Sequence, residues 1–375
     1  MKGKDMTKLT KIMLAMIASL SLLSTSYAGE VTVTGNAEAT YSISGAKTGT
    51  GVDDTDTVGG KGIGVANEID FTATGETDNG YTWKYQTQFD DGSATDDGRL
   101  EITSPFGTVG FYVSEGSLGS HYGWDVSAYG AGSDQGITTD AEINGIEASD
   151  YNNIQYHTPA DLLPFGIQAK VAFAPNGATG QTKAASVRAQ GANTADIAEA
   201  TSYQITATPI DGLSVGASYA EATHNGGVTA TKYQPENGSL YVKYAIGPAT
   251  IGYGKTYIQP RVAARTADTD TTNEARKYEN TSYGLGVSVN DQLSVSFTTE
   301  EFELTEVDVA VATDAETSAT PVINVDTIQA AYNVGGMTVA IGHAEADEIS
   351  YNGDNATAND EHDTTQTFIS VKMAF

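Results

Sequence analysis

The amino-acid sequence predicts an all-β protein, a 16-stranded antiparallel up-and-down transmembrane β-barrel. Three features indicate this fold. Segments of about ten residues alternate between apolar and polar side chains, the connections between them alternate between short and long, and the final segment ends on Phe375. In a membrane barrel, only every second residue of a strand faces lipid. In a closed barrel, the last strand pairs with the first and has no exposed edge.

The first 28 residues have the features of a secretory signal peptide. Four lysines make the start basic, and the apolar run that follows covers only residues 12–23. This run is shorter than the roughly 20 residues that a membrane-spanning helix needs. Ser26 and Ala28 supply the small side chains of a cleavage site. We therefore expect cleavage after Ala28, which leaves residues 29–375 as the barrel domain.

The composition excludes several other classes of protein. The chain contains no cysteine, so an exported protein of this sequence has no disulfide scaffold. After residue 28, no apolar stretch is long enough for a membrane-spanning helix. Without the signal peptide, 15 basic and 47 acidic residues remain, which gives a formal charge of −32. Such a surface repels nucleic acid and attracts small cations, so we expect no nucleic-acid partner.

Sixteen segments alternate with a period of two, and we expect each to form one strand. In the segment 81–90, for example, Tyr81, Trp83 and Tyr85 lie on one face and Lys84 lies on the other. The expected strands are residues 31–44, 62–75, 81–90, 98–104, 108–114, 152–158, 166–174, 201–208, 213–222, 238–246, 249–258, 279–288, 293–304, 323–333, 337–347 and 364–375.

The connections between these segments fall into two alternating classes. Seven are short and rich in Gly, Pro, Asn and Asp, which are the residues of tight turns. Eight are long and rich in Gly, Asp, Thr and Ala. An up-and-down barrel has one rim of short turns and one rim of long loops, and an even number of strands places both chain ends at the rim of short turns.

Alternation alone also fits soluble sandwiches, in which apolar faces cover one another. Sixteen strands would then require two or three domains, but the sequence shows no Pro- or Ser-rich linker and no shift of composition. Aromatic residues gather near the strand ends, as they do at a membrane interface. The membrane barrel is therefore favoured over a secreted, soluble, β-rich adhesin.

At this point the chain resembles the Gram-negative general diffusion porins. The resemblance rests on the signal peptide, the segment GEVTVTGNAEATYSIS that follows it, the sixteen strands and the terminal Phe375, and it covers essentially the whole mature chain. It implies a homotrimer of water-filled barrels in the outer membrane of a Gram-negative bacterium, each narrowed by the third long loop folding inward. It also implies that the last strand, with Phe375, is the signal read by the barrel-assembly machinery.

The resemblance identifies residues 115–151 as the loop that narrows the pore. This segment contains no Lys or Arg, whereas the strand register places basic side chains on the lumen wall facing it. The two sets imply a field across the pore, which orients dipolar solutes. The implied constriction residues are Glu115, Asp125, Asp134, Asp140, Glu142, Glu147 and Asp150, and the implied basic residues of the lumen wall are Lys84, Arg99, Lys170, Lys243 and Lys372.

The implied function is passive diffusion of small hydrophilic solutes and ions, with a preference for cations because of the acidic excess. The alternative is a channel of the same fold that prefers one substrate, such as a sugar. Tyr112, Tyr122, Trp124 and Tyr129 would then stack on sugar rings, although they would equally serve to pack the loop against the wall. The expected partners are outer-membrane lipid, lipopolysaccharide, further copies of the chain, small hydrophilic solutes and cations.

The sequence contains no motif for catalysis, a metal or a cofactor. The Asp-rich segments 53–57 and 268–274 lack the spacing of a calcium-binding loop, and the five histidines lack metal-ligand spacing. No nucleophile elbow or phosphate-binding loop occurs. We therefore expect a protein that is not an enzyme and that has no catalytic residues, no cofactor and no metal site.

Overall fold

The computed structural model describes residues 29–48, 55–57, 60–90, 97–133, 143, 145–177, 197–224, 231–263, 273–308, 316–318, 322–347 and 361–375. The predicted signal peptide and parts of both Asp-rich segments lie outside the described residues. Three of the candidate constriction residues, Asp134, Asp140 and Glu142, also lie outside them. Among the described residues, no helix is long and apolar enough to cross a membrane.

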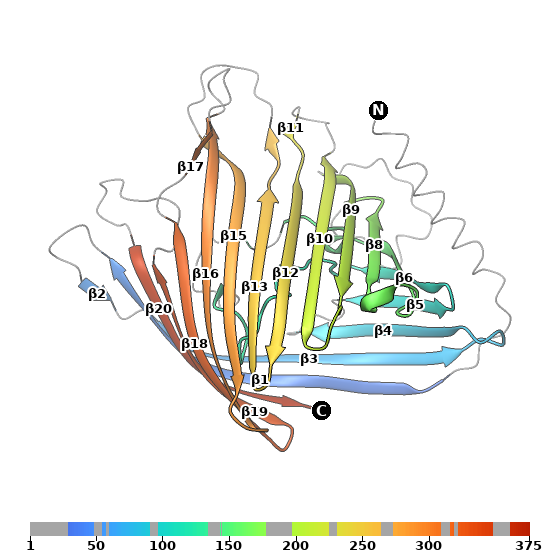
Figure 1. The fold of residues 1–375 in the computed structure, drawn as a ribbon, viewed down its shortest axis with the longest axis horizontal. Coiled ribbons are helices and arrows are strands. Elements are labelled where there is room, and N and C mark those ends of the chain that lie inside the picture. The colour runs from blue at the N-terminus through green and yellow to red at the C-terminus, as the bar shows by residue number, and fades with distance from the viewer. Residues whose placement is uncertain are drawn as a thin grey trace.

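Sixteen antiparallel strands of the described chain form one closed barrel (Figure 1). Each strand of the ring pairs with the next one along the chain, and the last strand, β20, pairs with β1 in a register that begins at Asn36 and Ala374. The predicted 16-stranded fold is therefore confirmed. The strands of the ring are β1 (Val31–Thr48), β3 (Lys61–Glu76), β4 (Thr82–Asp90), β5 (Gly98–Ser104), β6 (Gly107–Val113), β7 (Asn153–His157), β8 (Gln168–Ala174), β9 (Ile197–Ala207), β10 (Leu213–His224), β12 (Glu236–Ile246), β13 (Ala249–Gln259), β15 (Asn273–Ser288), β16 (Leu293–Asp308), β18 (Ile323–Val334), β19 (Met337–Asp347) and β20 (Glu361–Ala374).

Four short strands come from segments that the sequence places in long loops. β2 (Thr55–Thr57) pairs with β1, and β17 (Glu316–Ser318) pairs with β16, so both extend the barrel wall at the loop rim. β11 (Thr231–Tyr233) and β14 (Val262–Ala263) form a separate two-stranded sheet. Alternation over two or three residues is too short to predict a strand.

Both ends of the barrel domain lie at the rim of short turns. Gly35 on β1 and Phe375 exchange two backbone hydrogen bonds, of 2.8 and 3.0 Å. The amide of Ala374 donates to the carbonyl oxygen of Gly336 in the turn between β18 and β19. This turn places Gly335 and Gly336 at φ values of 57° and 81°, which favour glycine. In Figure 1 the C-terminus accordingly lies beside the short turns at the bottom of the view.

The outer face of the barrel is apolar and the inner face is polar. On β16, Val295 and Phe297 are 36% and 47% exposed, whereas Ser296 between them faces the lumen and is 6% exposed. A protein interior would bury such apolar side chains, so their exposure on every side of the ring indicates contact with lipid. Outward-facing, exposed apolar residues on other strands are Ile205, Leu240, Ile251, Leu285, Ile328, Ile341 and Ile369.

The apolar band ends at tyrosines on the side of the loop rim. From the turn rim upward, the outward face of β10 carries Leu213, Val215, Ala217, Tyr219 and then Glu221. Tyrosine places an apolar ring against lipid and a hydroxyl in water, which suits the boundary of a membrane. Above this boundary, the outward face becomes charged.

Candidate functional site

The loop between β6 and β7 comprises residues 115–151, and its described part, residues 115–133, 143 and 145–151, lies inside the barrel along the inner wall. We call it the inward loop. Its contacts with lumen-facing side chains follow the wall from β9 to β18, which confirms the predicted inward fold. Near the start of the loop, the carbonyl oxygen of Leu118 accepts a hydrogen bond from Gln204 on β9 at 3.1 Å, and the amide of Ser120 donates to Ser218 on β10 at 2.9 Å. Further along, the amide of Ala128 donates to Ser296 on β16 at 2.8 Å, and the amide of Tyr129 donates to Gln329 on β18 at 2.9 Å.

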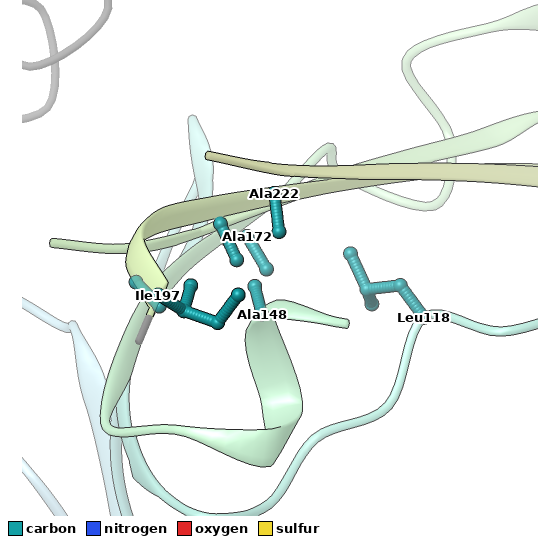
Figure 2. Close-up of a cluster of buried hydrophobic side chains, with 7 residues drawn as sticks. Leu118, Ala148, Ala172, Ile197 and Ala222 are labelled. Atoms are coloured by element: carbon teal, nitrogen blue, oxygen red, sulfur yellow. The ribbon is translucent and has the colours of Figure 1, made fainter. Parts of the chain in front are cut away.

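Both limbs of the inward loop pack against the same part of the wall (Figure 2). Leu118 from the outgoing limb and Ala148 from the returning limb meet Ala172 on β8, Ile197 on β9 and Ala222 on β10. A barrel of this width has no protein core of its own, so apolar contacts between loop and wall must hold the loop in place.

A second apolar cluster holds the far part of the inward loop. Ala128 and Tyr129 of the loop pack against Ala331 on β18, Ala340 on β19 and Phe368 on β20. The aromatic rings of Tyr129 and Phe368 lie 5.6 Å apart between centroids. The loop is therefore packed against the wall at widely separated points around the ring.

Tyr129 also joins the inward loop to the seam at which the barrel closes. Its hydroxyl donates to Oε1 of Glu38 on β1 at 2.5 Å and lies 2.7 Å from Oγ of Ser370 on β20. The Ser370 hydroxyl donates to the same carboxylate at 2.7 Å, and Nζ of Lys372 lies 4.0 Å from its other oxygen. The Glu38 carboxylate at the seam therefore anchors the loop through the hydroxyl of Tyr129.

The root of the inward loop is held by an ion pair. Oε1 of Glu115 lies 3.1 Å from Nη1 of Arg99 on β5. Nε of Arg99 donates to Gln86 on β4 at 3.0 Å, and Gln86 donates to Asp70 on β3 at 2.7 Å. Burial raises the pKa of the Glu115 carboxyl above its usual value, and the charge of Arg99 opposes this rise. These four side chains connect three wall strands to the loop.

The other described acidic residues of the inward loop accept hydrogen bonds from residues of the same loop. Oδ1 of Asp125 accepts the amide of Ser127 at 2.8 Å, and Oδ2 of Asp150 accepts the amide of Glu147 at 2.8 Å. Glu147 is only 5% exposed and accepts the hydroxyl of Ser117 at 2.8 Å. Burial raises the pKa of Asp150. These three carboxylates therefore shape the loop in addition to contributing charge to the lumen.

The five basic residues expected on the lumen wall are distributed around the ring. Lys84 on β4 lies opposite Glu101 of β5 in the register. Lys243 on β12 approaches the carbonyl oxygen of Asp125 at 3.5 Å, beneath the inward loop. The remaining three occupy other strands of the ring: Arg99 on β5, Lys170 on β8 opposite His157, and Lys372 on β20 beside Glu38.

Several lumen carboxylates were not among the residues selected from the sequence. Glu38, Glu68, Asp70 and Glu101 lie on strands β1, β3 and β5, on the same pleat face as the residues that contact the loop. The alternation of each strand contains the signal for them, since they share the parity of polar residues such as Lys84. The acidic residues predicted for the constriction all came from the loop, so these wall carboxylates were not among them.

The aromatic residues considered for sugar stacking divide into two groups. Trp124 is 1% exposed and Tyr112 is 3% exposed, and the hydroxyl of Tyr112 donates to Glu101 at 2.6 Å. Buried rings present no face to a solute, so Trp124 and Tyr112 pack the loop and the wall. Tyr122 and Tyr129 remain half-buried.

The raised pKa of Glu115 predicts a pH-dependent selectivity. As the pH falls from neutral toward the usual titration range of a glutamate, Glu115 should lose its charge at a higher pH than an ordinary glutamate does, and Arg99 should then act as an unpaired cation in the lumen. The ratio of cation to anion permeability should decrease over this range. Glu115→Gln should give a low ratio already at pH 7 and a weaker dependence of the ratio on pH. Reversal potentials in a salt gradient measure the ratio, and identical profiles for both proteins would contradict this role.

The comparisons with known proteins agree with this architecture. A model of the Gram-negative porin family matches residues 12–320. The anion-selective porin from Comamonas acidovorans is similar in structure, with a TM-score of 0.63 and 15% identity over 92% of this chain and 99% of that one. OmpT of Vibrio cholerae gives a TM-score of 0.57 at 12% identity over 94% of this chain and 100% of that one. OmpF of Salmonella typhi gives a TM-score of 0.55 at 13% identity over 92% of this chain and 97% of that one.

No curated protein sequence matches the chain. At these identities the similar structures show the fold, whereas the family match covers most of the sequence. The chain belongs to the Gram-negative porin family, and it is an outer-membrane diffusion channel.

Proposed function

We propose that this porin is a cation-preferring channel for small hydrophilic solutes and ions. Its aperture lies between the inward loop and the part of the wall formed by β1, β3, β4 and β5. The loop's path supports this location, because beyond its root at Arg99 the loop contacts the inner wall from β8 to β18 and reaches the seam at Glu38. The opposite part of the wall faces the remaining space.

The observation that carries this proposal is the excess of carboxylates on the lumen face of these four strands. The basic side chains on this face are Arg99, which forms an ion pair with Glu115, and Lys84, which lies opposite Glu101. A ring of carboxylates in a narrow pore concentrates cations and repels anions. The carboxylates on the lumen face of these strands are Glu38, Glu68, Asp70, Glu76, Asp90 and Glu101.

Cation preference is tested by the reversal potential across a planar bilayer that separates two concentrations of KCl. The double variant Glu68→Gln, Asp70→Asn should lower the ratio of potassium to chloride permeability by roughly twofold or more. Glu345→Gln is the matched control, because Glu345 is exposed on the outward face of β19. A wild-type reversal potential on the chloride side would contradict the proposal. The anion-selective Comamonas acidovorans porin provides a reference of the opposite sign.

We also propose the remaining parts of the expected biology. A signal peptide cut after Ala28 is supported by the barrel, whose first strand begins at Val31. An assembly signal at Phe375 is supported by its pairing with Gly35 at the seam, where the Phe375 ring lies over the glycine. A homotrimer in contact with lipid and lipopolysaccharide is supported by the family, and bilayer recordings would then show current steps in groups of three.

A further inference from the structure

Four glycines form a shallow groove in the lumen wall beneath the inward loop. Gly252 and Gly254 lie on β13, and Gly284 and Gly286 lie on β15. Gly252 and Gly284 are directly opposite each other in the register, and all four face the lumen. We call these four residues the glycine groove. The outward neighbours on the same strands are large, for example Ile251 and Leu285, so only the lumen face is bare.

The inward loop lies directly on the glycine groove. A Cβ atom at Gly252 would lie 1.9 Å from the carbonyl oxygen of Trp124, and one at Gly286 would lie 2.4 Å from the carbonyl oxygen of Val126. A Cβ atom at Gly254 would lie 2.3 Å from Cδ1 of the Trp124 side chain. Contacts between such atoms normally exceed about 3 Å, so the loop reaches this depth only because the wall has no side chains here.

Trp124 is the largest fully buried side chain of the described residues, at 1% exposed. Its burial results from the groove, because Gly254 and Gly284 leave room for its ring against the wall. Gly123, just before it, lies against the ring of Tyr241 on β12 and has no space for a side chain either. The loop segment from Gly123 to Val126 therefore fits closely against the wall, and the absence of side chains at the wall glycines determines how far the loop extends into the lumen.

We propose that the glycine groove sets the width of the aperture by fixing the depth at which Trp124 and Val126 are seated. Any side chain in the groove pushes the loop away from β13 and β15, toward the aperture wall of β3 and β4. The displacement needed at Gly252 is about 1 Å or more. This inference rests on the proposed position of the aperture, but the seating of the loop is measurable without any ion current.

The first test measures seating by fluorescence. The chain contains two tryptophans, so Trp83→Phe leaves Trp124 as the only emitter. In this background Trp124 should be protected from quenching by acrylamide, and adding Gly252→Ala should increase the quenching constant. Gly64→Ala is the matched control, because a Cβ atom at Gly64 on β3 has nothing within 4 Å. If Trp124 is freely quenched in the Trp83→Phe protein, the proposal is overturned, whether or not Gly252→Ala folds.

The second test measures the aperture through single-channel conductance in planar bilayers. Gly252→Ala and Gly286→Ala oppose backbone atoms of the loop, so each should lower the conductance by roughly a third. Gly254→Ala opposes Cδ1 and Cγ of the buried Trp124 side chain and should also lower the conductance. Conductance of Gly252→Ala and Gly286→Ala equal to or above that of Gly64→Ala would overturn the proposal. Loss of cation preference with this order of conductances intact would instead contradict the proposed function.

Discussion

Removing the inward loop should raise the single-channel conductance several-fold and admit larger solutes. Ser117 and Ser149 both donate to Glu147, at 2.8 and 3.2 Å, so the two limbs of the loop lie close together at this point. A short glycine linker in place of residues 118–148 should therefore join them without straining β6 or β7. The variant keeps the ion pair between Arg99 and Glu115 and removes the material that occupies the lumen.

The conductance of this deletion variant is measured in planar bilayers, and its folding is checked by heat-modifiable migration on gels. Tyr129→Phe is the graded control. It removes the hydroxyl that contacts Glu38 and Ser370 but keeps the ring against Phe368, so it should change the conductance far less. A folded deletion variant with the conductance of the wild type would show that the loop does not limit the pore.

Exchanging two neighbouring residues on β12 should destabilise the barrel without changing its composition. Val242 faces outward and is 40% exposed, whereas Lys243 faces the lumen beneath the inward loop. The double variant Val242→Lys, Lys243→Val turns a lysine toward lipid and a valine toward water. A lysine near the middle of the bilayer costs about 2–4 kcal/mol, so the free energy of unfolding should fall by about that amount.

Urea titration of the protein in lipid vesicles measures this free energy of unfolding. The two single variants separate the contributions. Val242→Lys should account for nearly all of the loss, and Lys243→Val should lie within about 0.5 kcal/mol of the wild type, because Lys243 faces the lumen, where its Nζ makes one long contact of 3.5 Å with the carbonyl oxygen of Asp125. An exchanged variant as stable as the wild type would mean that the outward face of β12 does not contact hydrocarbon.

The sixteen strands were predictable because each has a lipid face and a water face. The period of two survives wherever one face must be apolar, and it identifies β10 from Leu213 to Tyr219 as readily as β16 from Leu293 to Phe297. The ends at the loop rim were harder to predict. β15 begins at Asn273, before the predicted start at residue 279, because backbone pairing continues above the membrane, where no face needs to be apolar.

The candidate site was predictable only in part. The family resemblance identified the inward loop, but the loop's charge pattern does not distinguish a carboxylate that lines the pore from one that binds a backbone amide, as Asp125 and Asp150 do. The glycine groove is visible in the sequence as glycines that alternate with large residues in GYG (252–254) and GLG (284–286). Such a pattern gains meaning only when strands β13 and β15 are known to pair and the loop is known to lie across them.

The central claim is that the apolar face of the closed barrel meets lipid while the polar face encloses a water-filled path. Current recording from purified protein reconstituted in a planar lipid bilayer with KCl on both sides tests this claim most directly. The structure predicts discrete upward current steps as single channels insert, each proportional to the applied voltage. Protein that inserts fully into the bilayer and passes no current, or that stays soluble without detergent, would contradict it.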